Sequence, residues 1–379
     1  MAKLGELGKI ITGNTPKTSD AQNYESNDIC FVKPSDFTDN EITEIHQSEF
    51  YISAYAKDRA RVLPTDSILV TCIGIIGKVA INKVPCAFNQ QINAIVPEKK
   101  VCDPRYIAYA IQNLQPKMQS TANAAVVPIL NKTQFSNLEV PLLPVGEQKQ
   151  IACNLNKIDK LIFLRKQQLA KLDELVKARF VEMFGDPVKN TMDWEIKPLS
   201  ELGELNRGVS KARPRNSPEL LGGPYPLIQT GEVANAKTYI TSFNSTYSEK
   251  GLAQSKMWPK GTLCITIAAN IAQTSILTFD ACFPDSVVGF ISRNMTNELF
   301  IHYWFSFFQK ILDEQAPQVA QKNINLKILS ELNVIVPPLS LQNRFAAFVE
   351  RVDKQKQTVQ QSLEKLELMK KALMQEYFG

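Results

Sequence analysis

Few of the residue types that usually carry catalysis or bind metals fall into a recognisable pattern in this chain. The 379 residues include only two histidines, His46 and His302, in unrelated sequence contexts. Seven cysteines are scattered along the chain without a Cys-x-x-Cys spacing, which favours reduced thiols over disulfides or a zinc site. No His-Glu-x-x-His motif or EF-hand loop is present, so the sequence predicts no metal site.

One short segment superficially resembles a phosphate-binding loop. Gly74 and Gly77 precede Lys78, but only two residues separate the glycines and no Ser or Thr follows the lysine, so the P-loop pattern is not met. We interpret the segment as a tight turn between strands. No Gly-x-Gly-x-x-Gly follows a predicted strand, and Asp285 lacks a partner carboxylate and lysine at nuclease-like spacing. We therefore predict a binding or scaffolding protein without catalysis and without a cofactor.

The composition is that of an ordinary folded protein. Hydrophobic residues make up 44% and charged residues 21%, as in many well-packed proteins. No run of apolar residues is long enough to span a membrane and the start lacks an apolar signal core, so we expect a cytoplasmic protein with no membrane contact. The net charge of +5 permits a basic face for nucleic acid but does not require one.

The elements that must position any binding residues are present twice. The second half of the sequence matches the first at a shift of about 195 residues, over several landmarks in the same order. Residues 4–8, LGELG, return as residues 199–203, LSELG, and Gln148 returns as Gln342. Both halves also close on Phe-Gly. The sequence therefore predicts an internal pseudo-twofold repeat, whose period is too long for a solenoid.

Each half begins with short β-type runs separated by Pro, Gly and Asn. We predict strands at residues 67–73, 79–81, 262–267 and 286–291, and helices at residues 106–113 and 299–311. Mixed short strands and helices indicate an α+β fold for each globular domain.

After Pro144 and Pro338 the hydrophobic period changes to that of a long helix. Apolar residues then follow the alternating spacing of a coiled-coil seam, so we predict two long antiparallel helices that pack on each other. The predicted seam residues are Ile151, Leu155, Ile158, Ile162, Leu169, Leu172, Val176, Met183, Phe345, Val349, Val352, Val359, Leu363, Leu366, Leu373 and Tyr377. Polar residues interrupt the seam at Arg165, Arg179, Lys356 and Lys370. They either set the register of the helices or lie at the seam edge with solvated ends.

The predicted organisation has four parts. A first globular domain spans residues 1–146 and a first helical region spans 147–190. A second globular domain spans 191–340 and a second helical region spans 341–379.

This layout resembles the specificity subunit of type I restriction–modification systems. Local phrases add to the resemblance: GNTPK at residues 13–17, FNQQ at 88–91 and LEVPLLPVGEQ at 138–148. The resemblance implies that the globular domains are target-recognition domains, each reading one half of a split, asymmetric site in double-stranded DNA. It implies that the helices are spacers that dock two methyltransferase subunits, which restriction or motor subunits join. It also implies a non-catalytic subunit.

Base edges are read by particular side chains: Arg and Lys suit guanine, whereas Asn and Gln suit adenine. The first domain offers Asn14, Lys17, Arg59, Arg61, Lys78, Asn89, Gln90 and Gln91 as DNA-binding candidates. The second domain offers Arg207, Lys211, Arg213, Arg215, Gln229, Asn270, Gln273, Lys322 and Asn323. Residues 207–215 hold four basic residues and no acidic one, which makes this loop the best local candidate for phosphate contact or groove entry. A solvated surface loop is an equally open alternative. For residues 89–91 the alternative is a turn whose side chains cap the backbone.

The two halves diverge where the candidate residues lie. Pro284-Asp285 stands at the place of Asn89-Gln90, as expected if the two domains read different sequences. A second hypothesis is a coiled-coil interaction scaffold whose globular domains bind proteins. DNA binding by the purified chain would separate the two, and cleavage or methyl transfer by the isolated chain would instead indicate an unrecognised enzyme.

Overall fold

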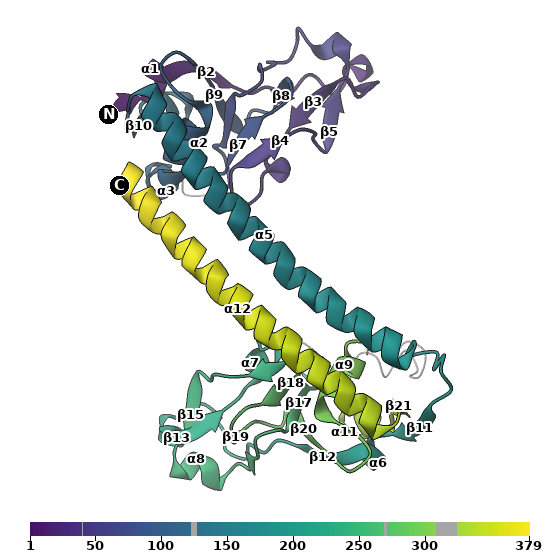
Figure 1. Ribbon diagram of the computed structural model, residues 1–379. Helices are drawn as coiled ribbons and strands as arrows, with labels where there is room; N and C mark the ends of the chain where they lie inside the picture. The colour runs from purple at the N-terminus through teal and green to yellow at the C-terminus, as the bar shows by residue number, and fades with distance from the viewer. Residues whose placement is uncertain (40, 123–126, 269–270, 308–323) are drawn as a thin grey trace. The chain divides into compact units, whose positions relative to one another are not determined.

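The computed structural model describes residues 1–39, 41–122, 127–268, 271–307 and 324–379. The chain forms two compact units. The first unit contains Met1–Gln167 and Gln360–Gly379, and the second contains Gln168–Val359. Each unit therefore holds one globular domain together with segments of both long helices, α5 (Val145–Phe184) and α12 (Leu339–Phe378) (Figure 1).

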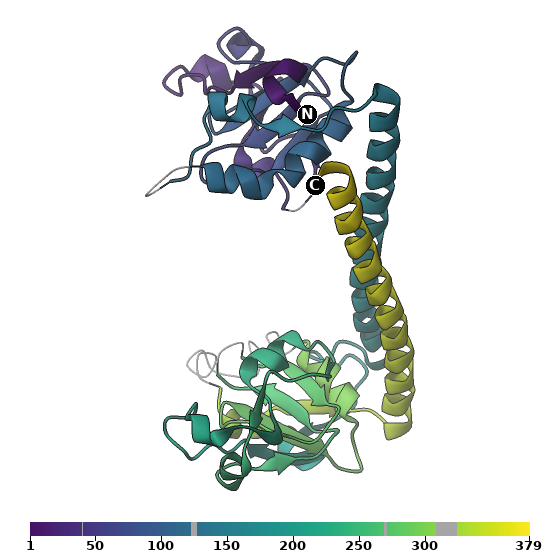
Figure 2. The same ribbon diagram turned by 90° about the vertical axis from the view of Figure 1, so that its left-hand side faces the viewer.

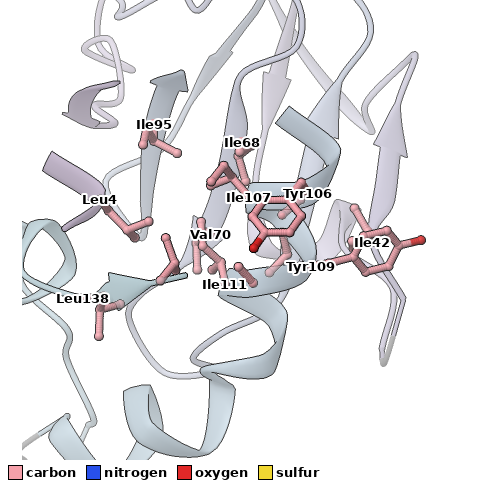
Figure 3. Packing of buried hydrophobic residues seen from close by; sticks show 14 of the residues in the cluster. Leu4, Ile42, Ile68, Val70, Ile95, Tyr106, Ile107, Tyr109, Ile111 and Leu138 are labelled. Atoms are coloured by element: carbon pink, nitrogen blue, oxygen red, sulfur yellow. The ribbon is translucent and has the colours of Figure 1, made fainter. Parts of the chain in front are cut away.

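The globular domain of the first unit is built on two sheets. The five-stranded sheet has the order β2 (Gly8–Thr12), β9 (Ile92–Pro97), β6 (Ile68–Thr71), β7 (Val79–Asn82) and β4 (Thr43–Ile45). The three-stranded sheet has the order β5 (Phe50–Ile52), β3 (Ile29–Val32) and β8 (Cys86–Phe88). Helix α2 (Pro104–Asn113) packs its buried face against the larger sheet, where Ile107 and Ile111 meet Ile68 and Val70 (Figure 3).

The globular domain of the second unit repeats this topology. Its five-stranded sheet has the order β12 (Gly203–Arg207), β20 (Val287–Ser292), β17 (Leu263–Thr266), β18 (Thr274–Leu277) and β14 (Tyr239–Ile240). In both domains the last strand of the five pairs in parallel and the others pair antiparallel. The smaller sheet has the order β15 (Ser245–Tyr247), β13 (Leu221–Leu227), β19 (Ala281–Cys282) and β16 (Met257–Trp258). The predicted α+β fold and its duplication are therefore confirmed.

The predicted elements differ from the observed ones mainly at their ends. The strand expected at residues 67–73 is Ile68–Thr71, and the helix expected at residues 106–113 is Pro104–Asn113. Helix α9 is Glu298–Phe305, and residues 308–311 of the helix predicted there lie outside the described residues. Gly74 and Gly77 have φ angles of 76° and 88° between β6 and β7, as the turn interpretation requires.

The two ends of each domain meet where its long helix begins. In the first domain β1 (Ala2–Lys3) pairs with β10 (Glu139–Val140). In the second, β11 (Glu195–Pro198) pairs with β21 (Asn333–Val336). The proline-rich segments that follow β10 and β21 cannot extend these ladders. The chain therefore leaves each sheet and enters a helix.

The long helices are α5 (Val145–Phe184) and α12 (Leu339–Phe378). Within each unit their segments lie side by side (Figures 1 and 2). In the first unit Lys370 pairs with Asp159 at 2.7 Å, and Arg165 donates to Ser362. Partner numbers fall along α12 as they rise along α5, so the helices run antiparallel in this unit. Among the described residues, no helix has the length and apolar character needed to cross a membrane.

Candidate nucleic-acid interface

In the first domain, the loop after β2 passes directly over the loop after β8. The backbone N–H of Gly13 donates to the Ile92 carbonyl and that of Asn14 donates to the Phe88 carbonyl, each at 3.0 Å. A Cβ atom on Gly13 would collide with the carbonyl oxygen of Asn89. Only glycine allows this close approach, so Gly13 is required by the crossing of the two loops.

A third loop joins this crossing through Asn14. Its side-chain amide donates to the Arg59 carbonyl at 2.8 Å, and its side-chain oxygen accepts from the Arg61 backbone N–H at 3.0 Å. The Thr15 hydroxyl donates to the side chain of Gln90 at 2.7 Å. Residues 13–17, 59–61 and 88–91 therefore form one surface, which we call the first reading surface.

Several exposed side chains of the first reading surface have the types that read or bind DNA. Lys17, Arg59, Arg61 and Gln90 are exposed. The guanidinium carbon of Arg59 lies 3.9 Å from the centre of the Tyr55 ring, and the guanidinium also donates to the Tyr55 hydroxyl at 2.9 Å. This stacking holds Arg59 in a defined orientation.

Asn89 and Lys78, like Asn14, do not present an open side chain. Asn89 is 6% exposed. Its side chain bonds with the side chain and backbone of Gln91, which fits the interpretation of a backbone-capping turn. Lys78 pairs with Asp39 at 2.7 Å and its side chain is 13% exposed. The side chains of Asn89 and Lys78 are therefore not available for contacts with DNA bases.

The second domain repeats the loop crossing with different side chains. The N–H of Gly208 donates to the Val287 carbonyl and that of Val209 donates to the Phe283 carbonyl. A Cβ atom on Gly208 would collide with the Phe283 carbonyl, so this glycine has the same role as Gly13. The loop 207–215 and residues 283–286 form what we call the second reading surface.

Asp285 organises the basic residues of the second reading surface. Its carboxylate lies 2.6 Å from an Nη atom of Arg215 and 3.8 Å from one of Arg213. Its backbone carbonyl accepts from Nε of Arg207 at 3.0 Å. Lys211 is exposed, and its backbone N–H donates to the Gln254 carbonyl at 3.3 Å. Three of the four basic residues singled out in the sequence therefore contact Asp285, and Lys211 is exposed on the same loop.

The remaining candidates of the second domain are dispersed. Gln229 is exposed and lines a pocket of about 180 Å³ with Arg215 and Ser210. Gln273 lines a different pocket, of about 520 Å³, so it does not join the arginine loop. Asn270, Lys322 and Asn323 lie outside the described residues.

Sequence reasoning missed the partner that holds the arginines. Asp285 was considered as a nuclease residue and as the counterpart of Gln90 in the repeat, but not as a partner of the arginines. The match to Gln90, which was itself a candidate, is the signal that could have added Asp285 to the candidate residues. Tyr55 was missed because its stacking on Arg59 joins residues that show no pattern in the sequence.

A buried glutamine fastens each long helix to its globular domain. Gln148 is fully buried, accepts from the Asp103 N–H at 2.9 Å and donates to the Val101 and Leu143 carbonyls. Asp103 is the N-cap residue of α2. The first turn of α5 is thereby tied to the start of the helix that covers the sheet.

Gln342 makes the matching contacts in the second unit. It accepts from the Asn297 N–H and the Thr296 hydroxyl, each at 3.0 Å, and donates to the Met295 and Pro337 carbonyls. Asn297 is the N-cap residue of α9. The repeated glutamine therefore has a structural role in both halves, because its buried hydrogen bonds connect the long helix to the globular domain.

Each unit also holds a charged contact between its two helix segments. In the first unit Asp159 accepts from the Tyr109 hydroxyl at 2.7 Å and pairs with Lys370. Burial and the neighbouring Asp159 raise the pKa of Tyr109 well above its usual value. In the second unit Lys356 pairs with Asp173 at 2.7 Å and with Asp353 at 3.4 Å. These lysines therefore join the helices at partly buried positions.

The lysine of the second unit is surrounded by buried titratable groups. Burial raises the pKa of Asp353, although Lys356 opposes the shift. Burial also lowers the pKa of Lys356, but its contacts with Asp173, Tyr303 and Asp353 outweigh that effect and raise it overall. Burial and Lys356 together lower the pKa of His302 to about 4, so His302 is neutral at pH 7.

Metal-binding and thiol chemistry have little support in the described part of the chain. No group of three or more His, Cys, Asp or Glu residues is placed there to hold a metal ion. All seven cysteines are free, and six of them are buried. Burial raises the pKa of Cys72 to about 11 and that of Cys86 to about 12, which disfavours the reactive thiolate.

Comparison with known proteins places this repeated architecture in one family. The family described as "Type I restriction modification DNA specificity domain" matches residues 1–174 and 191–368. The chain belongs to this family, and each half of the repeat carries one copy of its domain. Specificity subunits are the non-catalytic components of type I restriction–modification systems.

One relative and two solved structures illustrate the match. The type I restriction enzyme MjaIX specificity subunit of Methanocaldococcus jannaschii is 27% identical over 224 residues, which cover 54% of this chain and 52% of that relative. A chain from a structure on complex assembly and conformational transition of the type I system has a TM-score of 0.61 at 16% identity, covering 99% of this chain and 96% of that one. The type I S subunit from M. genitalium has a TM-score of 0.59 at 13% identity, covering 100% and 95%. At these identities the two structures support the fold alone.

Proposed function

We propose that the chain reads a split, asymmetric site in double-stranded DNA, with one reading surface for each half-site. The observation that carries the proposal is the repeated loop crossing. Gly13 and Gly208 make equivalent backbone hydrogen bonds in the two domains, while the side chains around them differ. The first reading surface offers Lys17, Arg59 and Gln90, whereas the second offers an arginine cluster around Asp285. A common frame with different polar side chains is what two readers of different sequences require.

The long helices are proposed to act as spacers with the domains fastened to them. Gln148 and Gln342 connect the domains to the helices through buried hydrogen bonds. The ion pairs of Lys370 with Asp159 and of Lys356 with Asp173 hold the helix segments together. The predicted seam residues of α5 and α12 are buried or half-buried, which supports their packing in the manner of a coiled coil. A rigid spacer keeps two half-sites at a fixed separation along the duplex.

The helices are also proposed to dock two methyltransferase subunits, which would recruit restriction or motor subunits. Leu161, Phe163 and Leu164 of α5 are 45–48% exposed. Leu175 of α5 and Met369 of α12 stand at equivalent places in the repeat and are also exposed, at 47% and 54%. Exposed apolar side chains of this kind favour protein contacts, and the equivalence of Leu175 and Met369 supports two like partners. A role in DNA recognition also supports the expected cytoplasmic location.

The test is selection of duplexes from a randomised library by the full-length chain bound to its methyltransferase partner. We expect a motif in two separated parts. Replacing residues 191–340 with the matching domain of a relative should change one part only, and replacing residues 1–146 should change the other.

Two results would contradict the proposal. Selection of no motif would favour the interaction scaffold, which needs no sequence preference. A change in both parts after a single replacement would show that the two domains do not read independently.

A further inference from the structure

Asp285 is an exposed acid at the centre of a basic loop. Its side chain is 37% exposed, and those of Arg213 and Arg215 are 58% and 42% exposed. Ion pairs with this exposure stabilise a folded chain very little. A carboxylate among basic residues also weakens attraction to phosphate groups. Neither chain stability nor phosphate binding therefore accounts for an acid at this position.

The loop around Asp285 is already held in shape by other contacts. The side chain of Gln254 accepts from the Ala212 N–H at 2.9 Å, and the Ser255 hydroxyl donates to the Val209 carbonyl at 2.7 Å. Arg207 bonds to the Asp285 backbone carbonyl, which any residue at this position would supply. Arg213 donates to the Ser210 and Ala212 carbonyls at 2.7 and 2.8 Å, so these backbone groups already orient its side chain. The carboxylate is therefore available to orient the Arg215 side chain.

Arg215 lies beside a pocket and contacts the Asp285 carboxylate. It lines the pocket of about 180 Å³ together with Ser210 and Gln229. The Ser210 residue is 6% exposed, and its hydroxyl has no hydrogen-bond partner among the described residues. A flexible guanidinium next to open space needs a partner to hold it in one direction, and the 2.6 Å contact with Asp285 supplies one.

We infer that Asp285 is a positioning residue for base recognition, which holds the Arg215 guanidinium so that its free N–H groups meet a guanine edge. This inference rests on the proposed function. An arginine reads guanine through two parallel hydrogen bonds to O6 and N7, so its orientation matters as much as its charge. The first domain carries neutral Gln90 at the equivalent place, bonded to Thr15. An acidic residue at this position is therefore present in the second reading surface and not in the first.

Three substitutions test the inference in the full-length complex, using selection from a randomised duplex library. Asp285→Ala removes both the charge and the hydrogen-bond acceptor, whereas Asp285→Asn removes the charge and keeps an acceptor. Arg215→Lys keeps the positive charge and loses the planar fork. Asp280→Ala is the matched control, because Asp280 is an exposed acid of the same domain that accepts from the Lys260 N–H.

The expected result is confined to one base pair. Asp285→Ala and Arg215→Lys should each reduce the preference for guanine at the same position by about tenfold or more. Asp285→Asn should keep most of that preference, and Asp280→Ala should keep all of it. The half-site read by the first domain should stay unchanged in every variant, which controls for general loss of folding.

Other results would overturn the inference without affecting the proposed function. If Asp285→Ala and Asp285→Asn bind all duplexes more tightly with every preference intact, Asp285 acts only through its charge. If Asp285→Ala unfolds, an unchanged motif for Arg215→Lys would still reject the role. Failure of the wild-type chain to select any motif would instead reject the proposed function itself.

Discussion

Gln342 illustrates how a single side chain can determine where a domain sits on its helix. The amide is fully buried and satisfies both donors and acceptors around the start of α9. Its four partners are polar groups that would otherwise be removed from water without hydrogen bonds. Loss of such a residue is costly because each stranded buried polar group carries a desolvation penalty.

We therefore predict that Gln342→Ala destabilises the chain by about 2–4 kcal/mol, since each unsatisfied buried group costs about 1–3 kcal/mol. Urea unfolding measures the change. The control is Gln355→Ala, an exposed glutamine on the same helix, which should change stability little. An equal effect of the two substitutions would show that the buried bonds of Gln342 contribute nothing specific.

The repeat in the sequence marked Gln148 and Gln342, but it could not assign their role. Their partners lie in the backbone of another helix cap, which leaves no trace in residue types. Asn14 shows the same limitation, because its type suggested an adenine contact while its amide joins two loops. Polar residue type predicts hydrogen bonding, and only the fold determines whether the partner is the chain itself.

The long helices were predicted more completely, because a period of apolar residues is a property of a whole element. The sequence placed their starts after Pro144 and Pro338, and the structure begins them at Val145 and Leu339. It left open whether the lysines of the seam set register or only lie at its edge. Lys370 contacts Asp159 of the opposite helix segment, and both side chains are less than a fifth exposed. That geometry favours a role in register.

A double-mutant cycle on Asp159→Asn and Lys370→Met tests this role. Each single substitution leaves one charged side chain partly buried without its oppositely charged partner, so we expect a loss of about 1–3 kcal/mol. The double variant should lose less than the sum, with a coupling of about 1 kcal/mol or more. Asn at position 159 still accepts from Tyr109, which keeps that bond out of the cycle.

The exposed pair Lys171 and Glu174 on α5 is the control for the cycle. Its coupling should be close to zero, because exposed charges are well solvated. Additive losses for Asp159 and Lys370 would mean that the pair does not couple the helices, and that the apolar seam alone fixes their register.

At the scale of the whole molecule, the duplication explains why each unit takes segments from both long helices. The two helices end in Phe-Gly, and each terminal Phe is buried in the unit opposite to the one where its helix began. In the first unit the ring centroids of Phe378 and Tyr106 lie 5.1 Å apart. In the second unit the ring centroids of Phe184 and Phe300 lie 4.9 Å apart. The contacts are equivalent in the repeat, so each helix starts on one domain and finishes against the other.

Because each helix starts on one domain and ends against the other, we predict that helix length determines the gap between the two half-sites in the DNA. Inserting one heptad into each helix, after Gln167 and after Val359, adds about 10 Å at roughly 1.5 Å per residue. A heptad preserves the apolar seam, and both insertions together keep the ends of the helices matched. At about 3.4 Å per base pair, the selected DNA motif should gain roughly three base pairs in its gap.

Selection from a randomised duplex library measures this gap directly, with both half-motifs serving as internal controls. They should keep their sequences, because no reading surface is altered. An insertion in α5 alone should instead weaken folding, since Phe184 and Lys370 could not both retain their partners. A doubly extended chain that selects the original gap would show that the helices do not act as the ruler, and that the separation of half-sites is set elsewhere in the complex.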